Sequence, residues 1–315
     1  MASNEIAILD PAATVDKLNK IAADRAVNRR RFIAALGITG AAAGAGLLSG
    51  CANNASSPIA PLGAGQTDIL NFVLNIEYLQ ATFYAYLTTG ADLSASVTAN
   101  SGVITGAPAA LAVGTGITQQ TIDLLNEIYF DDLNHVSYLR SVLGSAVVPR
   151  PAINLAAFGA IIPTNALSLA RLLKDLGVTA YASAVTGLSS SNATYLGQIL
   201  GAESFHSGAL RLISIQNTTT ITYTPITDGL GYDVPPADLG TAGLGAAGPT
   251  ASGGFFPTSG GAIAPTNTNT GIGYARTIKQ VLQVLYGASN TAPASHGSFS
   301  GGFFPNGVNG NLTTS

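Results

Sequence analysis

The chain has 315 residues, of which 47% are hydrophobic and 9% are charged, far below the roughly 25% charged residues usual in soluble proteins. Its formal net charge is −3 and it has no basic cluster outside the N-terminus, which argues against a nucleic-acid partner. The single cysteine, Cys51, excludes an internal disulfide. A surface made largely of small uncharged residues suits an extracytoplasmic protein.

The N-terminal region has the layout of an export signal. Three arginines followed by Phe and Ile at residues 29–33 precede an apolar stretch rich in Ala, Gly and Leu. The Arg29-Arg30 pair is typical of a twin-arginine signal, and the Leu-Ser-Gly-Cys segment that ends at Cys51 resembles a bacterial lipobox. A membrane anchor or a buried helix is the alternative, but the apolar run is short for about 30 Å of hydrocarbon. We therefore predict a signal region at residues 1–51, passage through the twin-arginine export machinery, acylation of Cys51 and a membrane-anchored lipoprotein of the periplasm or cell envelope.

Four helices are predicted after a Pro/Gly/Ser-rich tether at residues 52–65, because apolar residues recur every three to four positions. The expected helices cover residues 66–88, 118–143, 165–186 and 192–216. Thr67 or Asp68 is the expected N-cap of the first helix. A long loop is expected at residues 89–116. We assign residues 66–217 to an all-α four-helix bundle.

Residues 218–315 are predicted to be a C-terminal extension that packs on the bundle. It is rich in Gly, Pro and Thr, with a short strand expected at 218–224 and one more helix at 273–286. The sequence Ser-Gly-Gly-Phe-Phe-Pro occurs at 252–257 and again at 300–305. Two copies are too few for a solenoid, so each is interpreted as a turn that docks a Phe pair on the bundle.

Acidic and histidine side chains interrupt the apolar stripes near the middle of three of these helices. A buried ionised carboxylate is costly unless it is paired or bound to a cation. Because the interruptions fall at the same level of three helices, the sequence predicts a shared metal site in the bundle core. The candidate ligands are Glu77, Asp132, His135, Glu203 and His206.

The spacing of these residues makes the prediction more specific. Asp132-x-x-His135 and Glu203-x-x-His206 each place a carboxylate and an imidazole on one helix face. Di-metal bundle sites use a Glu from each of two helices and a Glu-x-x-His from each of the other two. The alternative is that each pair is satisfied by its own hydrogen bond on a polar face. His296, in a Gly/Ser-rich tail, is interpreted as a solvated loop histidine.

Several segments resemble the ferritin-like domain family, which includes plant desiccation-related proteins and many exported bacterial proteins. The similar segments are residues 75–84, 131–136, 177–181, 202–206 and 301–307. The resemblance covers roughly residues 66–310. It implies a ferritin-like bundle with a long crossover between the second and third helices, and it implies little about biochemistry.

Two departures from that pattern bear on the metal count. The second helix carries Asp132 where such sites usually have Glu, and the third helix has no clear core glutamate. Tyr181 lies on the matching face of the third helix, whereas Asp175 lies off the apolar stripe. Five ligands in place of six predict that one metal ion binds tightly and a second weakly or not at all.

Carboxylate and imidazole ligands suit iron, manganese and zinc, and the redox hypothesis favours iron or manganese. The expected roles are an oxidase, an oxygen or peroxide scavenger, or a ferroxidase. The alternative is a structural or desiccation-related envelope lipoprotein without a metal, whose working surface is formed by the loops at 89–116 and 225–270.

Overall fold

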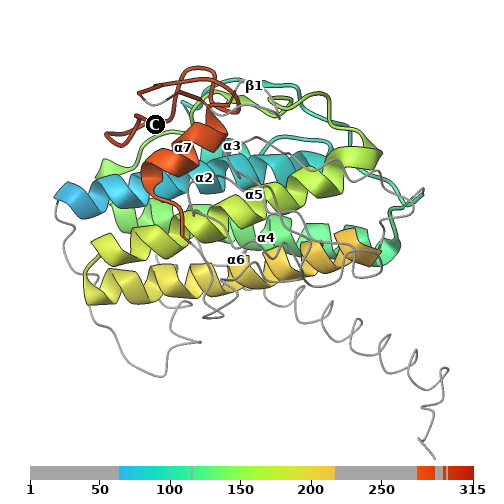
Figure 1. The fold of residues 1–315 in the computed structure, drawn as a ribbon, viewed down its shortest axis with the longest axis horizontal. Helices are drawn as coiled ribbons and strands as arrows, with labels where there is room; N and C mark the ends of the chain where they lie inside the picture. Colours follow the sequence, from blue (N-terminus) through green and yellow to red (C-terminus); the bar gives the residue numbers. More distant parts are fainter. Residues whose placement is uncertain (1–63, 99, 115, 217–274, 288–293, 296) are drawn as a thin grey trace, which may run out of the picture. The chain divides into compact units, whose positions relative to one another are not determined.

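The structure is a computed structural model that describes residues 64–98, 100–114, 116–216, 275–287, 294–295 and 297–315 (Figure 1). Four long helices dominate these residues and confirm the predicted all-α class: α2 (Ala64–Thr89), α4 (Gln119–Leu143), α5 (Pro163–Ala184) and α6 (Ser190–Gln216). Arg29, Arg30, Cys51, residues 52–63 of the predicted tether, the expected strand at 218–224, His296 and the Phe pair of 252–257 lie outside the described residues. The last two residues of the predicted tether, Ala64 and Gly65, are part of α2.

Helix starts follow local capping chemistry, and those of the first, third, fourth and last helices lie two to five residues from the predicted positions. Thr118 caps α4, since its hydroxyl accepts a hydrogen bond from the Thr121 amide at 3.1 Å. The first helix begins at Ala64, so Thr67 and Asp68 lie inside it and are not its N-cap. The last helix, α7 (Ile278–Leu285), begins later than expected because Thr277 forms a capping box there.

The helices pack in a connected set in which α2 contacts α4 and α5, and α6 contacts α5 and α4. Every residue from 70 to 85 in α2 and from 166 to 177 in α5 is buried. These two helices are covered on a second side, because α7 packs on α5 and the C-terminal segment contacts α2. A helix that is buried on several sides must be apolar around most of its circumference, as both segments are.

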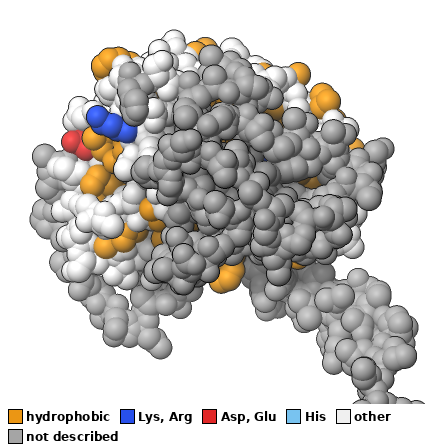
Figure 2. Space-filling view, in the orientation of Figure 1, with side chains coloured by type: hydrophobic (Ala, Val, Ile, Leu, Met, Phe, Trp, Pro, Cys, Tyr) orange, Lys and Arg blue, Asp and Glu red, His pale blue; other side chains and the backbone are white. Residues whose placement is uncertain are grey.

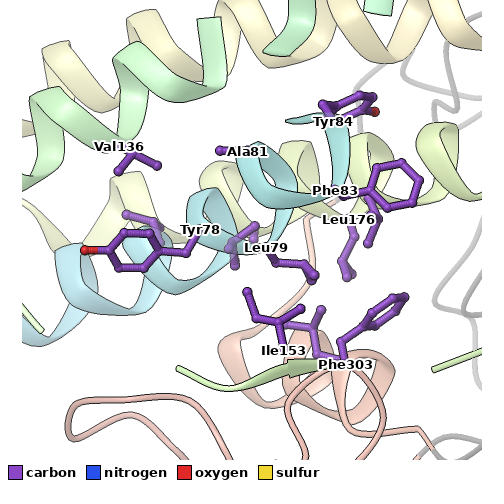
Figure 3. Packing of buried hydrophobic residues seen from close by; sticks show 14 of the residues in the cluster. Tyr78, Leu79, Ala81, Phe83, Tyr84, Val136, Ile153, Leu176 and Phe303 are labelled. Carbon is purple, nitrogen blue, oxygen red and sulfur yellow. The ribbon is translucent and has the colours of Figure 1, made fainter. Parts of the chain in front are cut away.

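The C-terminal segment is fixed by the Phe pair of the second Gly-Gly-Phe-Phe copy. Phe303 and Phe304 are fully buried in the hydrophobic core, part of which Figure 3 shows, and the centre of the Phe303 ring lies 4.8 Å from that of Phe158. The turn needs glycine, because φ of Gly301 is 138° and an added Cβ would lie 2.5 Å from the Tyr286 carbonyl oxygen. This copy therefore docks its aromatic pair in the core.

The segment predicted as a long loop contains two short elements. These are α3 (Ala95–Thr98) and β1 (Ile104–Thr105), and β1 pairs in parallel with β2 (Ile153–Asn154). The amide of Ile153 donates to the Val103 carbonyl at 3.0 Å. This pairing joins residues about fifty positions apart, so local periodicity does not reveal it. Two single turns of 3₁₀ helix, Gly144–Ala146 and Val185–Gly187, follow α4 and α5.

The face drawn in Figure 2 shows few charged side chains among the described residues, which agrees with the low charge content of the sequence. Within the described part of the chain, no helix has the length and apolar character needed to cross a bilayer.

Candidate metal centre

Four of the five predicted ligands come together between α2, α4 and α6. Glu77, Asp132, His135 and Glu203 each offer a ligand atom, and these atoms all lie within 4.8 Å of one another. The three carboxyl side chains are fully buried, and His135 is 13% exposed. The mid-helix positions read from the sequence therefore converge on one point of the core.

The spacing around His135 suits a common ion. Its Nδ1 atom is 3.5 Å from Glu77 Oε2 and 3.5 Å from Glu203 Oε1, and 4.0 Å from Asp132 Oδ1. Two ligands bound to the same transition metal at about 2.1 Å lie about 3.0–3.5 Å apart. A single ion would need only small side-chain movements to reach these atoms.

Each predicted ligand also has a buried atom that finds no hydrogen-bond partner within the described part of the chain. Buried polar atoms are normally paired, so an unpaired atom calls for a specific explanation. The predicted ligands carry five such atoms, and four of these residues form the group that could hold a metal ion. The five atoms are Glu77 Oε2, Asp132 Oδ2, His135 Nδ1, Glu203 Oε2 and His206 Nδ1.

The fifth predicted residue, His206, lies at the edge of the group of four. Its Nδ1 is 3.8 Å from Glu203 Oε1, the same oxygen that His135 approaches. On its other side, His206 Nε2 is 3.1 Å from Asp131 Oδ2. A carboxylate that accepts the second ring N–H is the usual support of a metal-binding histidine. The arrangement therefore suits a ligand that Asp131 holds in place.

The main residue that the sequence reasoning missed is Lys174 of α5. Its ammonium is fully buried and donates to Asp132, to Glu203 Oε1 at 2.7 Å and to Gln80 Oε1 at 2.8 Å. The sequence held a signal for it, because Lys174 lies on the same helix stripe as Ala170 and Tyr181. The third helix therefore places an ammonium in the cluster, where typical sites of this kind have a carboxylate.

Neighbouring side chains fix the carboxylates in position. The Tyr181 hydroxyl donates to Glu77 Oε1, so the third-helix tyrosine does point at the site. The Gln80 amide donates to the Leu173 carbonyl at 2.8 Å while its oxygen accepts from Lys174. Gly177 leaves room for this packing, since an added Cβ would overlap Gln80 Nε2.

Charges within the cluster shift the protonation of its members. Burial opposes protonation of His135, but the adjacent Glu77 and Glu203 carboxylates outweigh it and raise its pKa to about 10. Burial would raise the pKa of Glu203, yet Lys174 and the two histidines hold it well below its usual range. For Asp132, burial raises the pKa well above its usual range despite Lys174.

Asp175 belongs to a separate buried cluster. It accepts hydrogen bonds from Arg171 at 2.7 Å, from Arg211 Nη2 at 2.6 Å and from Ser207 at 2.5 Å. Burial would raise its pKa, but Arg211 and Arg171 hold it below the usual value. These contacts explain why a charged residue off the apolar stripe is nevertheless buried.

A search of curated proteins found no match to the chain. Residues 65–216 match the family model described as a ferritin-like domain, and these residues comprise the four long helices and every member of the candidate metal centre. The chain therefore carries a ferritin-like domain at residues 65–216, with a buried carboxylate and histidine group that could hold a metal ion at its centre.

Proposed function

We propose that the domain is a redox metalloprotein that holds one iron or manganese ion. The ligands are Glu77, Asp132, His135, Glu203 and His206. The observation that carries this proposal is the set of five buried ligand atoms without hydrogen-bond partners on these residues. A bound iron or manganese ion would supply the one-electron chemistry needed to oxidise a substrate or to consume oxygen or peroxide.

The residues around the ligands have distinct supporting roles in this proposal. Asp131 accepts from His206 Nε2, and in the neutral tautomer this leaves Nδ1 free to act as an acceptor toward the interior. Tyr181 occupies one oxygen of Glu77 and leaves the other available. The three carboxylates of the ligands are buried, while Asp131 is 34% exposed and lies at the solvent-facing edge of the site beside His206.

The cellular setting of the proposal rests on the sequence. The Arg29-Arg30 pair and Cys51 support export by the twin-arginine route and anchoring in the envelope through a lipid. That route transports folded proteins, so the metal would be bound before export. We also propose that residues 144–162 form the long crossover of the bundle and that residues 218–315 are an extension related to desiccation-related proteins.

A second function is favoured by Lys174. Its ammonium already neutralises part of the carboxylate charge, so the bundle has an internal cation even without a metal. On this hypothesis the chain is a metal-free structural or desiccation-related lipoprotein, and the helices are a scaffold for its loops.

Metal content separates the two functions. The full chain should be isolated after native export and analysed for its elements, beside Glu203→Gln and the control Asp123→Asn, which removes an exposed carboxylate on α4. We expect about one iron or manganese ion per chain in the wild type and the control, and none in Glu203→Gln. A wild type without metal, or equal content in all three proteins, would reject the metal-binding function.

Mass spectrometry tests the proposed anchor. The mature protein should begin at Cys51 and carry a diacylglyceryl group on that residue. An unmodified N-terminus upstream of residue 29 would show that the region is not a lipoprotein signal.

A further inference from the structure

We infer that Lys174 is a resident cation that permanently occupies one of two cation positions in this cluster. The inference rests on the proposed function, since it concerns how many metal ions the same carboxylates accept. It accounts for the third helix, which contributes neither a glutamate nor an aspartate to the group.

The position of Lys174 in the bundle is the first support. A two-metal bundle site takes one Glu from each of two helices and a Glu-x-x-His from each of the other two. Here α4 and α6 carry the paired motifs and α2 carries the single Glu77, so α5 is the remaining helix. Lys174 is the α5 residue that reaches Asp132 and Glu203. It therefore stands where the second single glutamate of such a site would stand.

The contacts of Lys174 show an ammonium that is fully coordinated. A lysine has three N–H donors, and here they meet three acceptors on Asp132, Glu203 and Gln80. Its side chain is fully buried and its nitrogen lies 5.3 Å from the centre of the Tyr84 ring. Moving such a group to solvent would break charge-assisted hydrogen bonds on several helices at once.

The charge balance of the cluster also favours one metal ion and not two. Glu77, Asp132 and Glu203 contribute three negative charges when ionised, and Lys174 contributes one positive charge. One divalent ion together with Lys174 brings the buried cluster to neutrality. Two divalent ions together with Lys174 would leave two uncompensated positive charges in a low-dielectric core, which is strongly unfavourable.

The two carboxylates that Lys174 binds each keep one oxygen without a hydrogen-bond partner among the described residues. Lys174 binds Asp132 Oδ1 and Glu203 Oε1, whereas the oxygens without hydrogen-bond partners are Asp132 Oδ2 and Glu203 Oε2. Each of these two carboxylates thus presents one oxygen to the resident ammonium and keeps the other. With an ion bound, Asp132 and Glu203 would be shared between Lys174 and that ion, as carboxylates are shared between two metals in other bundle sites.

Replacing Lys174 with glutamate tests the inference by metal count. The full chain is stripped of metal, dialysed against Mn²⁺ and analysed for ions per chain. We expect about one ion in the wild type and about two in Lys174→Glu, because four carboxylates balance two divalent ions. The matched control is Arg171→Met, which removes a buried cation from the same helix and should leave the count at about one, since Arg171 pairs with Asp175.

Two ions in the wild type, or no increase in Lys174→Glu, would overturn the inference while the metal-binding function stands. No ion in the wild type would overturn that function, and Lys174→Glu then still decides the role of the lysine. If Lys174→Glu binds two ions, Lys174 fills a cation position in the wild type. If Lys174→Glu binds no ion, it does not.

A second variant covers the case in which Lys174→Glu fails to fold. Lys174→Met removes the charge and keeps the apolar stem, so three buried carboxylates lose their resident cation. Added Mn²⁺ should then raise the Tm of Lys174→Met more than it raises the Tm of the wild type or of Arg171→Met. Equal Tm shifts in the three proteins would contradict the inference.

Discussion

Asp131 and His206 connect the solvent-facing edge of the ferritin-like domain to its buried centre. The His206 ring lies between two carboxylates, with Nε2 at 3.1 Å from Asp131 Oδ2 and Nδ1 at 3.8 Å from Glu203 Oε1. Asp131 is adjacent to the ligand Asp132 in the sequence, but it faces the edge of the site. The two neighbouring aspartates thus face the same candidate metal centre from two sides of α4.

Replacing Asp131 with asparagine should weaken metal binding without removing a ligand. An amide is neutral and holds the His206 ring less firmly, so Nδ1 would be presented less often to the metal. Loss of such an outer partner usually costs about 10- to 100-fold in metal affinity. Competition titration with a chelator would measure the Kd, with Asp123→Asn as the control for loss of a carboxylate on the same helix. A Kd equal to that of the wild type would show that Asp131 does not support His206.

Gly177 should not tolerate alanine, because its missing side chain makes space for the site. An added Cβ would overlap Gln80 Nε2 and lie 3.1 Å from Glu203 Oε2. Forcing a methyl group into such packing costs about 1–3 kcal/mol. Urea unfolding of Gly177→Ala should therefore show a lower free energy of unfolding than the wild type.

The control for this change is Gly197→Ala on α6. Apart from the backbone of its own helix, no atom of the described residues lies within 4 Å of the position that its Cβ would take, so alanine should stabilise the helix by up to about 1 kcal/mol. The two substitutions are chemically identical and should have opposite signs. A stabilising Gly177→Ala would mean that the site has more room than the packing indicates.

The sequence predicted the four long helices because each has an apolar period of three to four residues, and it predicted the ligands because charged residues interrupt that period. Glu77 and Glu203 are recognisable in this way, since a carboxylate in an apolar stripe needs a partner. The short β1–β2 pairing was missed because it joins Ile104 to Ile153, far along the chain.

Lys174 escaped prediction for a different physical reason. A lysine on an otherwise apolar stripe is usually interpreted as an amphipathic side chain whose head reaches water, so its place on the stripe alone does not predict a buried ammonium. Only the arrangement of α2, α4 and α6 around it shows that the head meets Asp132 and Glu203 instead. The carboxylates and histidines of the cluster could be predicted from the local helix pattern. The inclusion of Lys174 depends on how the helices pack and could not.

The metal-free chain should lose stability as the pH rises. The pKa of His135 is raised to about 10 by Glu77 and Glu203 against the effect of burial, and that of His206 to about 9 by Asp131 and Glu203. Both values lie above the unfolded value of about 6.5. Protonation of these rings therefore stabilises the fold fully below about pH 6.5, and this contribution is lost as the pH rises through 9 to 10.

Urea unfolding after chelator treatment, at several pH values between 6 and 9, would measure this loss. His206→Gln removes one of the two titrating rings, so the decrease should be smaller in that variant. A free energy of unfolding that stays constant or increases over this range would show that the histidines are not protonated in the metal-free site.

Asp175 should be important for stability and unimportant for the metal. Replacing it with asparagine removes the carboxylate that Arg171 and Arg211 share in the core, and it leaves Glu77, His135 and Glu203 in place. Breaking a buried ion pair by removing one partner costs about 3–5 kcal/mol, because the remaining charge loses its compensation. In a domain of this size that corresponds to a decrease in Tm on the order of 10 °C. The ion count per chain should equal that of the wild type, since Asp175 binds Ser207 and the two arginines and not the proposed ligands in the described part of the chain. Glu203→Gln should show the reverse pattern, with lost metal and a helical bundle that persists in circular dichroism. A fall in metal content in Asp175→Asn at a temperature where the variant remains folded would show that the two buried clusters are coupled through α5.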